Sequence, residues 1–359
     1  MRPASVSVPG KLILMGEHAV VYGRPALATA VDRRLKVEMR PNAVGRVRLD
    51  LRDFGTTRDL SWNDIVRGTE RAVAAWHAYA EEPSPERFAA IQEIQAEGPE
   101  HVVRIALGRG ALRAETNAGV DLHISSEIPL GSGFGSSAAV AVGVVAALRA
   151  ARGESVEPTT IAAEALEVER CQHGRPSGID TETVVRGGLV WAERCAPDGP
   201  LQFSSFTPRS SLLDRILVYD TGRPEESTGE VVSAVRARRD SNPAAFERAL
   251  DRMTEATRAF RTTLESSEAS LAALIESIRI FEMNLEMLGA VPPAVAERAR
   301  QVERAGGALK VSGAGASRGN SAGTILALWP TQPAPESDPL AVWTPRPVRA
   351  APLGLQIEE

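Results

Sequence analysis

The segment Pro129-Leu-Gly-Ser-Gly-Phe-Gly-Ser-Ser-Ala-Ala139 stands directly before a long apolar run. Its three glycines allow backbone N–H groups to converge on one point, and Ser136 and Ser137 lie where a helix is expected to begin. The positive end of a helix favours anions, phosphate above all, and a hydroxyl in this place can also bind Mg²⁺. Residues 136–151 are apolar on every side, which predicts a buried helix. A glycine-rich turn capped by serine is the alternative.

The spacing of these glycines excludes the commonest nucleotide motifs. No Gly-Lys-Ser/Thr follows them, as a Walker A motif requires, and G-x-G-x-G is not the Rossmann fingerprint. The chain has no His-Arg-Asp, so the segment is not the glycine-rich loop of a protein kinase. Gly135-Ser-Ser-Ala-Ala139 loosely resembles a hydrolase nucleophile elbow around Ser137, but the second glycine and a clear late histidine partner are missing.

Three further segments combine turn residues with titratable side chains. Pro9–Leu27 places Lys11 before an apolar strand and Gly-Glu-His after it, which suggests the wall of a site. Glu167–Asp180 ends a predicted helix near Glu169, and a glycine- and proline-containing turn then delivers the final aspartate. Lys310–Gly323 is a second glycine-rich loop between predicted strands. Taken singly, the first also fits an edge strand with a turn, and the second fits surface acids at a helix end.

The composition excludes several classes of protein. A net charge of −5 and a pI near 5.8 argue against a broad nucleic-acid surface. Cys171 and Cys195 cannot form a disulfide framework, and no HExxH zinc pair occurs. The longest apolar run, Ala138–Leu148, covers about half a membrane span, and Met1–Pro9 shows no signal peptide. We therefore expect a soluble cytoplasmic protein that binds neither nucleic acid nor membrane.

The basic residues are very unevenly chosen, since only three of the 41 are lysines, namely Lys11, Lys36 and Lys310. Arginine carries a wide planar fork, whereas lysine carries a compact ammonium group. A lysine kept in this background can mark a place where arginine does not fit, with chance as the alternative.

The pattern along the chain mixes strands and helices without regular βα alternation, which predicts an α+β fold. Alternating residues at 46–52 and 120–125 predict strands with one exposed face. We place a domain boundary near residue 187, between domains 1–187 and 188–359, and expect a loop over the proline-rich segment 329–347. The remaining predicted elements are helices over 61–80, 84–107 and 136–151, a mostly helical stretch over 227–304, and strands over 35–39, 189–192, 215–218, 308–311, 324–328 and 353–357.

Together the four glycine-containing segments resemble those of the GHMP kinases in order and spacing, over essentially the whole chain. 'PLGSGFGSSAA' resembles the phosphate loop of that family, and 'GKLILMGEHAVVYGRPALA' and 'ERCQHGRPSGID' resemble segments of its mevalonate kinases. Met283–Gly289 also resembles a mevalonate kinase helix. Ala19-Val20 follows Gly-Glu-His where galactokinases have Thr-Asp, which argues against a sugar substrate. The resemblance implies an ATP-binding N-terminal domain, a ferredoxin-like C-terminal domain, and an active site in the cleft between them.

The resemblance also implies roles for individual residues. Asp180 would be the catalytic base with Lys11 as its partner, and Ser137 and Glu169 would hold Mg²⁺. Ser126 would lie against the nucleotide. The loop that wraps the ATP phosphates would comprise Gly131, Ser132, Gly133, Phe134, Gly135, Ser136 and Ser137. The acceptor site would be lined by Glu17, His18, Thr228 and Gly313.

The implied reaction is phosphorylation of the 5-hydroxyl of mevalonate by ATP and Mg²⁺, in the route to isoprenoids. A phosphomevalonate kinase or a related small hydroxy-acid kinase is the alternative, and a non-catalytic ligand-binding relative is a third interpretation. Two departures from the family pattern concern the acceptor: the third motif is longer and carries Arg318, and residues 331–347 replace a family helix. Arg318 would favour a phosphorylated acceptor or a nucleotide phosphate, or would face solvent. A homodimer is left open.

Overall fold

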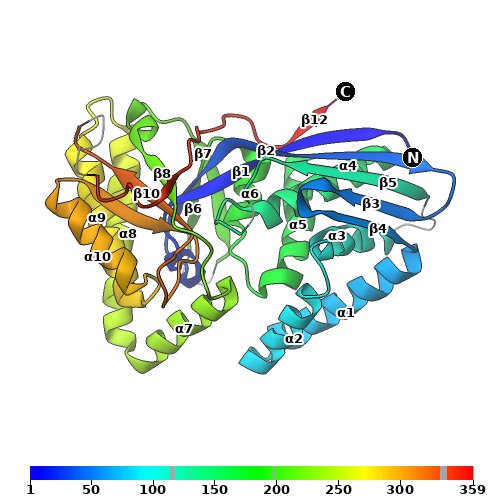
Figure 1. Cartoon of the computed structure of the whole chain (residues 1–359), viewed down its shortest axis with the longest axis horizontal. Coiled ribbons are helices and arrows are strands. Elements are labelled where there is room, and N and C mark those ends of the chain that lie inside the picture. Colours follow the sequence, from blue (N-terminus) through cyan, green and yellow to red (C-terminus); the bar gives the residue numbers. More distant parts are fainter. Residues whose placement is uncertain (114–117, 130, 197–198, 332–337, 359) are drawn as a thin grey trace.

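The computed structural model describes residues 1–359 except 114–117, 130, 197–198, 332–337 and 359. Its mixed sheets and helices confirm the predicted α+β class, and they form two parts that lie side by side (Figure 1). The strands of the larger sheet are β1 (Ala4–Met15), β2 (Ala26–Asn42), β3 (Val47–Leu51), β4 (Thr56–Leu60), β5 (Gly119–Ser126), β6 (Leu189–Arg194), β7 (Leu201–Phe206) and β12 (Gln356–Glu358).

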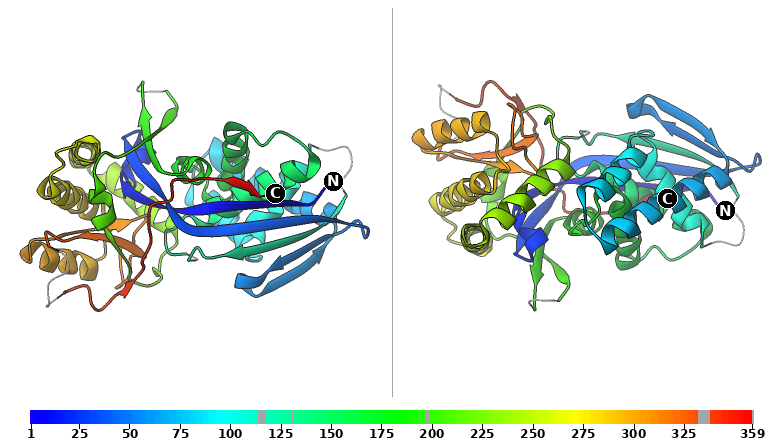
Figure 2. Two further views of the ribbon diagram at one scale, coloured as in Figure 1. Left: turned by 90° about the horizontal axis from the view of Figure 1, so that it is seen from above. Right: turned by 90° about the horizontal axis from the view of Figure 1, so that it is seen from below.

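The larger sheet has the order β12-β1-β2-β5-β3-β4, with β6 added to β2 and β7 added to β6. All of its pairs are antiparallel except β3 with β5. The long strands β1 and β2 run from this sheet toward the second part (Figure 2). β6, β7 and β12 follow residue 187 in the chain yet join this sheet. The hydrogen-bonded layer therefore crosses the predicted boundary, and the division into domains stays a prediction.

The predicted apolar helix is buried, and it packs on the long central strands. α4 contacts β1 and β2, and thirteen of its residues are buried. At Gly143 a Cβ atom would lie 2.7 Å from Val37 Cγ2, so glycine allows the helix to approach the sheet. The helices of this part are α1 (Trp62–Glu81), α2 (Pro85–Gln95), α3 (His101–Ala111), α4 (Ser136–Arg152), α5 (Pro158–His173) and α6 (Ile179–Arg186).

The second part is a smaller sheet with the order β11-β8-β10-β9, covered by helices (Figure 1). α9 packs on β9 and against α8, and most of its apolar side chains are buried. The elements of this part are β8 (Leu217–Asp220), α7 (Thr228–Ser241), α8 (Pro243–Glu265), α9 (Leu271–Leu288), α10 (Pro293–Arg304), β9 (Ala308–Ser312), β10 (Thr324–Leu328) and β11 (Thr344–Pro345).

Two expectations about local structure need correction or completion. The single helix predicted over 84–107 is two helices, because the chain turns around Gly98-Pro99 between α2 and α3. The proline-rich segment contains no helix among its described residues, as predicted; part of it, 332–337, lies outside them. Within the described chain, no helix has both the length and the hydropathy that a membrane span requires.

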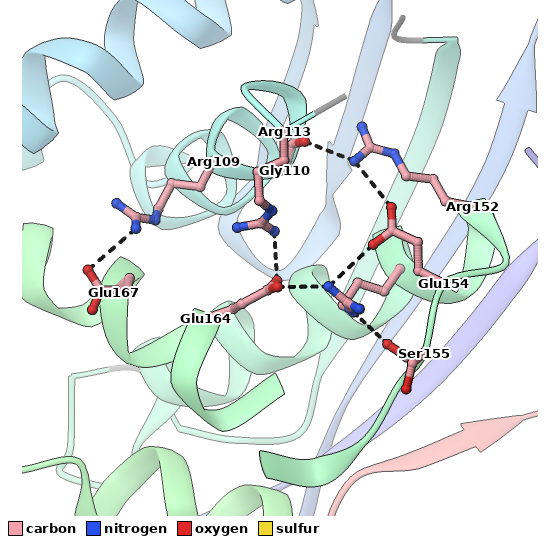
Figure 3. Close-up of polar contacts among 9 residues, drawn as sticks. Arg109, Gly110, Arg113, Arg152, Glu154, Ser155, Glu164 and Glu167 are labelled. Atoms are coloured by element: carbon pink, nitrogen blue, oxygen red, sulfur yellow. Dashed lines mark hydrogen bonds and ion pairs between the residues drawn. The ribbon is translucent and has the colours of Figure 1, made fainter. Parts of the chain in front are cut away.

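A network of arginines and glutamates joins α5 to α3 and α4 (Figure 3). Glu164 accepts hydrogen bonds from Arg113 and Arg149, each at 2.7 Å, and Glu167 pairs with Arg109 at 3.4 Å. Glu164 is only 18% exposed, so its pairs are partly shielded from water. The network holds in place the helix that carries Glu169.

Glu164→Ala is expected to lower the free energy of unfolding by about 1–2 kcal/mol, because two arginines lose a shared, partly buried acceptor. Urea unfolding at pH 7 measures the change. Glu157→Gln is the control, since Glu157 is exposed just before the same helix and its side chain has no hydrogen bond or ion pair in the described part of the chain. Equal stability of the Glu164→Ala variant and the original chain would contradict a stabilising role for the network.

Candidate active site

The glycine-rich loop ends at the first residue of α4, so it presents backbone N–H groups and the positive end of the helix. Gly135 has φ +71°, and a Cβ atom there would lie 2.7 Å from Lys11 Cγ. Glycine is therefore required twice, for its conformation and for the close approach of the lysine. The Lys11 N–H also donates to the Phe134 carbonyl at 2.9 Å, which ties β1 to the loop.

Lys11 and Asp180 form an ion pair across the site, with Lys11 Nζ 3.0 Å from Asp180 Oδ1. The lysine side chain is 4% exposed, whereas the aspartate side chain is 37% exposed and faces the cavity. Lys11 comes from β1, and Asp180 lies in the first turn of α6, directly after the predicted glycine- and proline-containing turn. The sequence placed both residues at the site, and the fold brings them into contact.

A second polar cluster lies beside this pair. Ser137 Oγ donates a hydrogen bond to Glu169 Oε2 at 3.1 Å and lies 3.3 Å from His173 Nε2. Burial, reinforced by nearby Asp180, raises the pKa of Glu169 to about 8. Glu169 Oε1 is buried without a hydrogen-bond partner. A hydroxyl next to a buried carboxylate with an unused oxygen is a donor set that suits Mg²⁺ when phosphate oxygens complete the ligands.

No group of three or more His, Cys, Asp or Glu side chains within the described ranges could hold a metal ion by itself. A cation at Ser137 and Glu169 would thus need ligands from a bound nucleotide, which is the usual arrangement for Mg²⁺ at phosphate sites.

One cavity of about 410 Å³ connects the predicted residues. Of the predicted set, its lining includes Lys11, Glu17, His18, Gly131, Gly133, Gly135, Ser136, Ser137, Glu169, Asp180, Thr228 and Gly313. Ser132 lines an adjoining cavity of about 360 Å³. Four sequence segments that lie far apart in the chain therefore share one space.

Two predicted nucleotide contacts lie elsewhere. Ser126 is not among the described residues that line these cavities; it ends β5, and its N–H donates to Asp53 Oδ2 at 2.6 Å. The Phe134 side chain is 1% exposed and packs in the core, so this residue contributes only its backbone to the surface of the loop. Their roles in nucleotide binding stay predictions.

Glu17 and His18 are buried and held by the third glycine-rich segment. Lys310 Nζ donates to Glu17 Oε1 and also to the Val311 carbonyl at 2.7 Å. His18 Nε2 lies 2.8 Å from the carbonyl oxygen of Ala314, so Nε2 carries the proton. Burial lowers the pKa of His18, which leaves a neutral ring whose Nδ1 can accept a hydrogen bond. Lys310 thus has a structural role, fixing the first motif to the third.

Glu282 completes this buried cluster, since it accepts the Val311 N–H at 2.9 Å, and burial raises its pKa from 4.5 to about 8. The folded protein then holds a proton that the unfolded chain releases, so the stability supplied by Glu282 falls as pH rises from about 4.5 to about 8. Glu282→Gln cannot ionise. We therefore expect the variant to become more stable relative to the original chain as pH rises. From pH 5 to pH 8, the difference between their free energies of unfolding should shift by roughly 2–4 kcal/mol in favour of Glu282→Gln.

Urea unfolding at pH 5, 6, 7 and 8 measures this gain. Glu276→Gln, an exposed position on the same helix, is the control and should give a constant difference. A pH-independent difference for Glu282→Gln would show that Glu282 titrates in its ordinary range.

Comparison with known proteins agrees with this geometry. A family model described as the GHMP kinases N terminal domain matches residues 100–188. A mevalonate kinase of Archaeoglobus fulgidus is 30% identical over 86% of this chain and 88% of its own length. One of Thermococcus gammatolerans is 30% identical over 98% of both chains. The chain belongs to the mevalonate kinase family of the GHMP kinases.

Solved structures of the family share the fold at low identity. The mevalonate kinase of Methanococcus jannaschii has a TM-score of 0.67 and 21% identity, covering 90% of each chain. A Streptococcus pneumoniae phosphomevalonate kinase complexed with phosphomevalonate and AMPPNP has a TM-score of 0.65 and 18% identity, covering 91% of this chain and 93% of the other. These likenesses support the predicted two-domain GHMP kinase fold.

The GHMP kinase cavity includes residues that the sequence reasoning missed. His173 follows Glu169 by four residues, so helical spacing could have placed both on one face of α5. Arg236 follows Thr228 by eight residues and lines the same cavity. In so arginine-rich a chain, a single arginine cannot be recognised from the sequence as a site residue. Apolar lining residues, among them Ile13, Val20, Tyr79, Phe88 and Val232, carry no recognisable motif.

The longer third motif lines the cavities at both of its ends, through Gly313 and Gly323, whereas its middle residues, Ser317 and Arg318, are absent from the described lining. Arg318 is exposed and is absent from the described lining of both. Its N–H donates to Glu226 Oε2 at 3.1 Å, and the Ser317 hydroxyl donates to the same carboxylate. Of the three alternatives for Arg318, the structure therefore favours the one in which it faces solvent.

Proposed function

We propose that the chain transfers the γ-phosphoryl group of ATP to the 5-hydroxyl of mevalonate, giving 5-phosphomevalonate and ADP in isoprenoid biosynthesis. The observation that carries this proposal is the Lys11–Asp180 ion pair, which lines the same cavity as the phosphate loop. The mevalonate kinases similar to this chain span nearly all of its length.

The reaction needs a base for a poorly nucleophilic primary alcohol. Asp180 is partly exposed to the cavity, so its carboxylate can accept the hydroxyl proton as the oxygen attacks phosphorus. The Lys11 ammonium group, 3.0 Å from that carboxylate, can stabilise the developing negative charge on the same oxygen. The aspartate can thus accept the proton, and the lysine can stabilise the negative charge, of the same hydroxyl oxygen.

The residues proposed to bind ATP hold its phosphates in position and form no covalent bond with them. Phosphoryl transfer depends mostly on holding the reactants in line and neutralising charge. The N–H groups of the glycine-rich loop and the N-terminus of α4 can bind the phosphates. Ser137 and Glu169 are the residues that would hold Mg²⁺, which when bound supplies charge neutralisation at the phosphates.

The acceptor side offers His18, Glu17 and Thr228. Neutral His18 can accept a hydrogen bond from a substrate hydroxyl through Nδ1, whereas it is poorly suited to pair with a carboxylate. Thr228 begins α7 and lines the cavity. We assign these residues to the hydroxyl-bearing part of the acceptor.

A coupled ADP-release assay with mevalonate, phosphomevalonate, galactose and homoserine tests the proposal. We expect turnover with mevalonate that needs Mg²⁺. Turnover with phosphomevalonate alone would establish the alternative kinase, and ligand binding without ADP release would establish a non-catalytic relative. Arg318 is exposed and absent from the described lining of both cavities, so its position does not support a phosphorylated acceptor. Cytoplasmic location and a homodimer stay predictions.

A further inference from the structure

The turn at residues 16–18, which carries Glu17 and His18, has a backbone conformation that needs support from outside. Gly16 has φ +104°, and a Cβ atom there would lie 2.4 Å from Ala26 Cα. His18 has φ +56°, and in the described part of the chain it is the one residue other than glycine with a positive φ. Such a conformation is costly for a residue with a Cβ atom, and it persists where the surrounding fold holds it.

That support comes from the third glycine-rich segment. His18 Nε2 donates to the Ala314 carbonyl at 2.8 Å, and Lys310 Nζ donates to Glu17 Oε1. The side chains of Lys310 and Glu17 are 0% and 1% exposed, so water does not compete for this ion pair. Lys310 Nζ also lies over the Phe281 ring, 5.3 Å from its centroid. Lys310 therefore fixes the place of the Glu17 carboxylate.

Glu17 has one oxygen that the ion pair does not use. Oε1 accepts from Lys310, whereas Oε2 is buried and has no hydrogen-bond partner among the described residues. Glu17 lines the same cavity as Lys11 and Asp180. A buried carboxylate oxygen without a partner is costly until a donor reaches it. Oε2 is therefore suited to accept a hydrogen bond from a hydroxyl group of the acceptor.

The charge on Glu17 also depends on Lys310. Burial raises the pKa of Glu17, and Lys310 opposes this effect more than any other group, through its charge and its hydrogen bond. Lys11 lowers the pKa of Glu17 as well, from β1. Glu282, the acid on α9 that interacts with Lys310, is uncharged below about pH 8, and burial keeps His18 neutral. Without Lys310, the buried carboxyl group would keep its proton to higher pH.

We propose that Lys310 is a positioning residue for phosphoryl transfer, which orients Glu17 so that Oε2 accepts a hydrogen bond from a hydroxyl group of the acceptor. The role rests on the proposed function, because it supposes a hydroxy acid in the cavity. It goes beyond joining the first motif to the third, since the loss of Lys310 is then felt by the acceptor rather than by ATP.

A double-mutant cycle with Lys310→Met, Glu17→Gln and the double variant tests this role. Each single change should raise KM for mevalonate about 10- to 100-fold, the range for a weakened hydrogen bond to a charged group, with KM for ATP within about twofold. The double variant should stay within about twofold of Glu17→Gln, because Lys310 then has no carboxylate to orient. Losses that multiply in the double variant overturn the proposal. If Lys310→Met does not fold, the comparison of Glu17→Gln with the double variant still decides.

The pH profile of kcat/KM for mevalonate is a readout that a merely structural role would not move. In Lys310→Met the pKa of Glu17 rises further, so the acid limb should move to higher pH and activity should partly return as pH rises. The double variant has no carboxyl group at position 17 and should lack this shift. An unmoved acid limb in Lys310→Met contradicts the proposal.

Glu282→Gln is the control for general damage to the buried cluster. Glu282 accepts the Val311 N–H at 2.9 Å and is absent from the described lining of the cavity. It is uncharged at pH 7, so its replacement should leave KM for mevalonate unchanged at that pH. A rise in KM equal to that of Lys310→Met would mean that any disturbance of the cluster reaches the acceptor, and Lys310 would have no specific role.

Calorimetric titration of the same four chains with mevalonate separates failure of this role from failure of the proposed function. If the original chain binds mevalonate without phosphorylating it, the reaction is wrong, and the same cycle in Kd decides the role of Lys310. If the chain phosphorylates mevalonate but the losses multiply, only the role of Lys310 is wrong. If it phosphorylates a different hydroxy acid, the cycle is measured with that acid. An original chain that neither binds nor phosphorylates a hydroxy acid contradicts both.

Discussion

Asp180→Asn is expected to lower kcat at least about 100-fold, within the range that a positioned general base contributes. Asparagine has nearly the same shape but cannot take the hydroxyl proton. The proposed nucleotide site is the glycine-rich loop and the N-terminus of α4, which this change leaves intact, so affinity for ATP should stay within about threefold. Steady-state turnover and calorimetric titration with ATP measure the two quantities.

The matched control for Asp180→Asn is Glu182→Gln, which neutralises a carboxylate two residues away on the same helix. Glu182 pairs with Arg186 and is absent from the described cavity lining, so turnover should be nearly normal. A kcat for Asp180→Asn within tenfold of the original chain would remove Asp180 from proton transfer. An equal loss in both variants would indicate damage to α6 rather than to catalysis.

The sequence was most informative where backbone geometry limits residue choice. The glycines at 131, 133 and 135 all have positive φ, and each lies in the loop that the motif predicted. The apolar run at 136–151 could only be a buried helix, and α4 is one. Local rules suffice there because the phosphate loop and the helix are made by neighbouring residues.

Contacts between distant segments could not be read in the same way. Glu17 and Lys310 are 293 positions apart, and no pattern around either one reveals that a buried ion pair joins them. The placement of β6 and β7 in the first sheet likewise depends on the pairing of β6 with β2 and of β7 with β6, which their own residues do not reveal. Such features follow from the tertiary arrangement, and local sequence patterns are silent about them.

The space around Lys11 explains why this position has a lysine in a chain that otherwise uses arginine. Its stem passes under Gly135, where a Cβ atom would already lie 2.7 Å from Cγ and 2.8 Å from Cε. The side chain is 4% exposed and ends 3.0 Å from Asp180. A compact ammonium group fits this narrow passage, whereas a guanidinium fork is wider and planar and would displace the loop or the carboxylate.

Lys11→Arg is therefore expected to lower kcat at least about 100-fold although the positive charge is kept, because the charge no longer lies where the alkoxide develops. ATP should still bind, as titration calorimetry would show. Lys36→Arg is the control, since Lys36 is 45% exposed and pairs with Glu38 and Glu358 on the surface of the sheet. Near-normal turnover of Lys11→Arg would mean that the site needs only a charge, and the space under Gly135 would then have no part in selecting lysine.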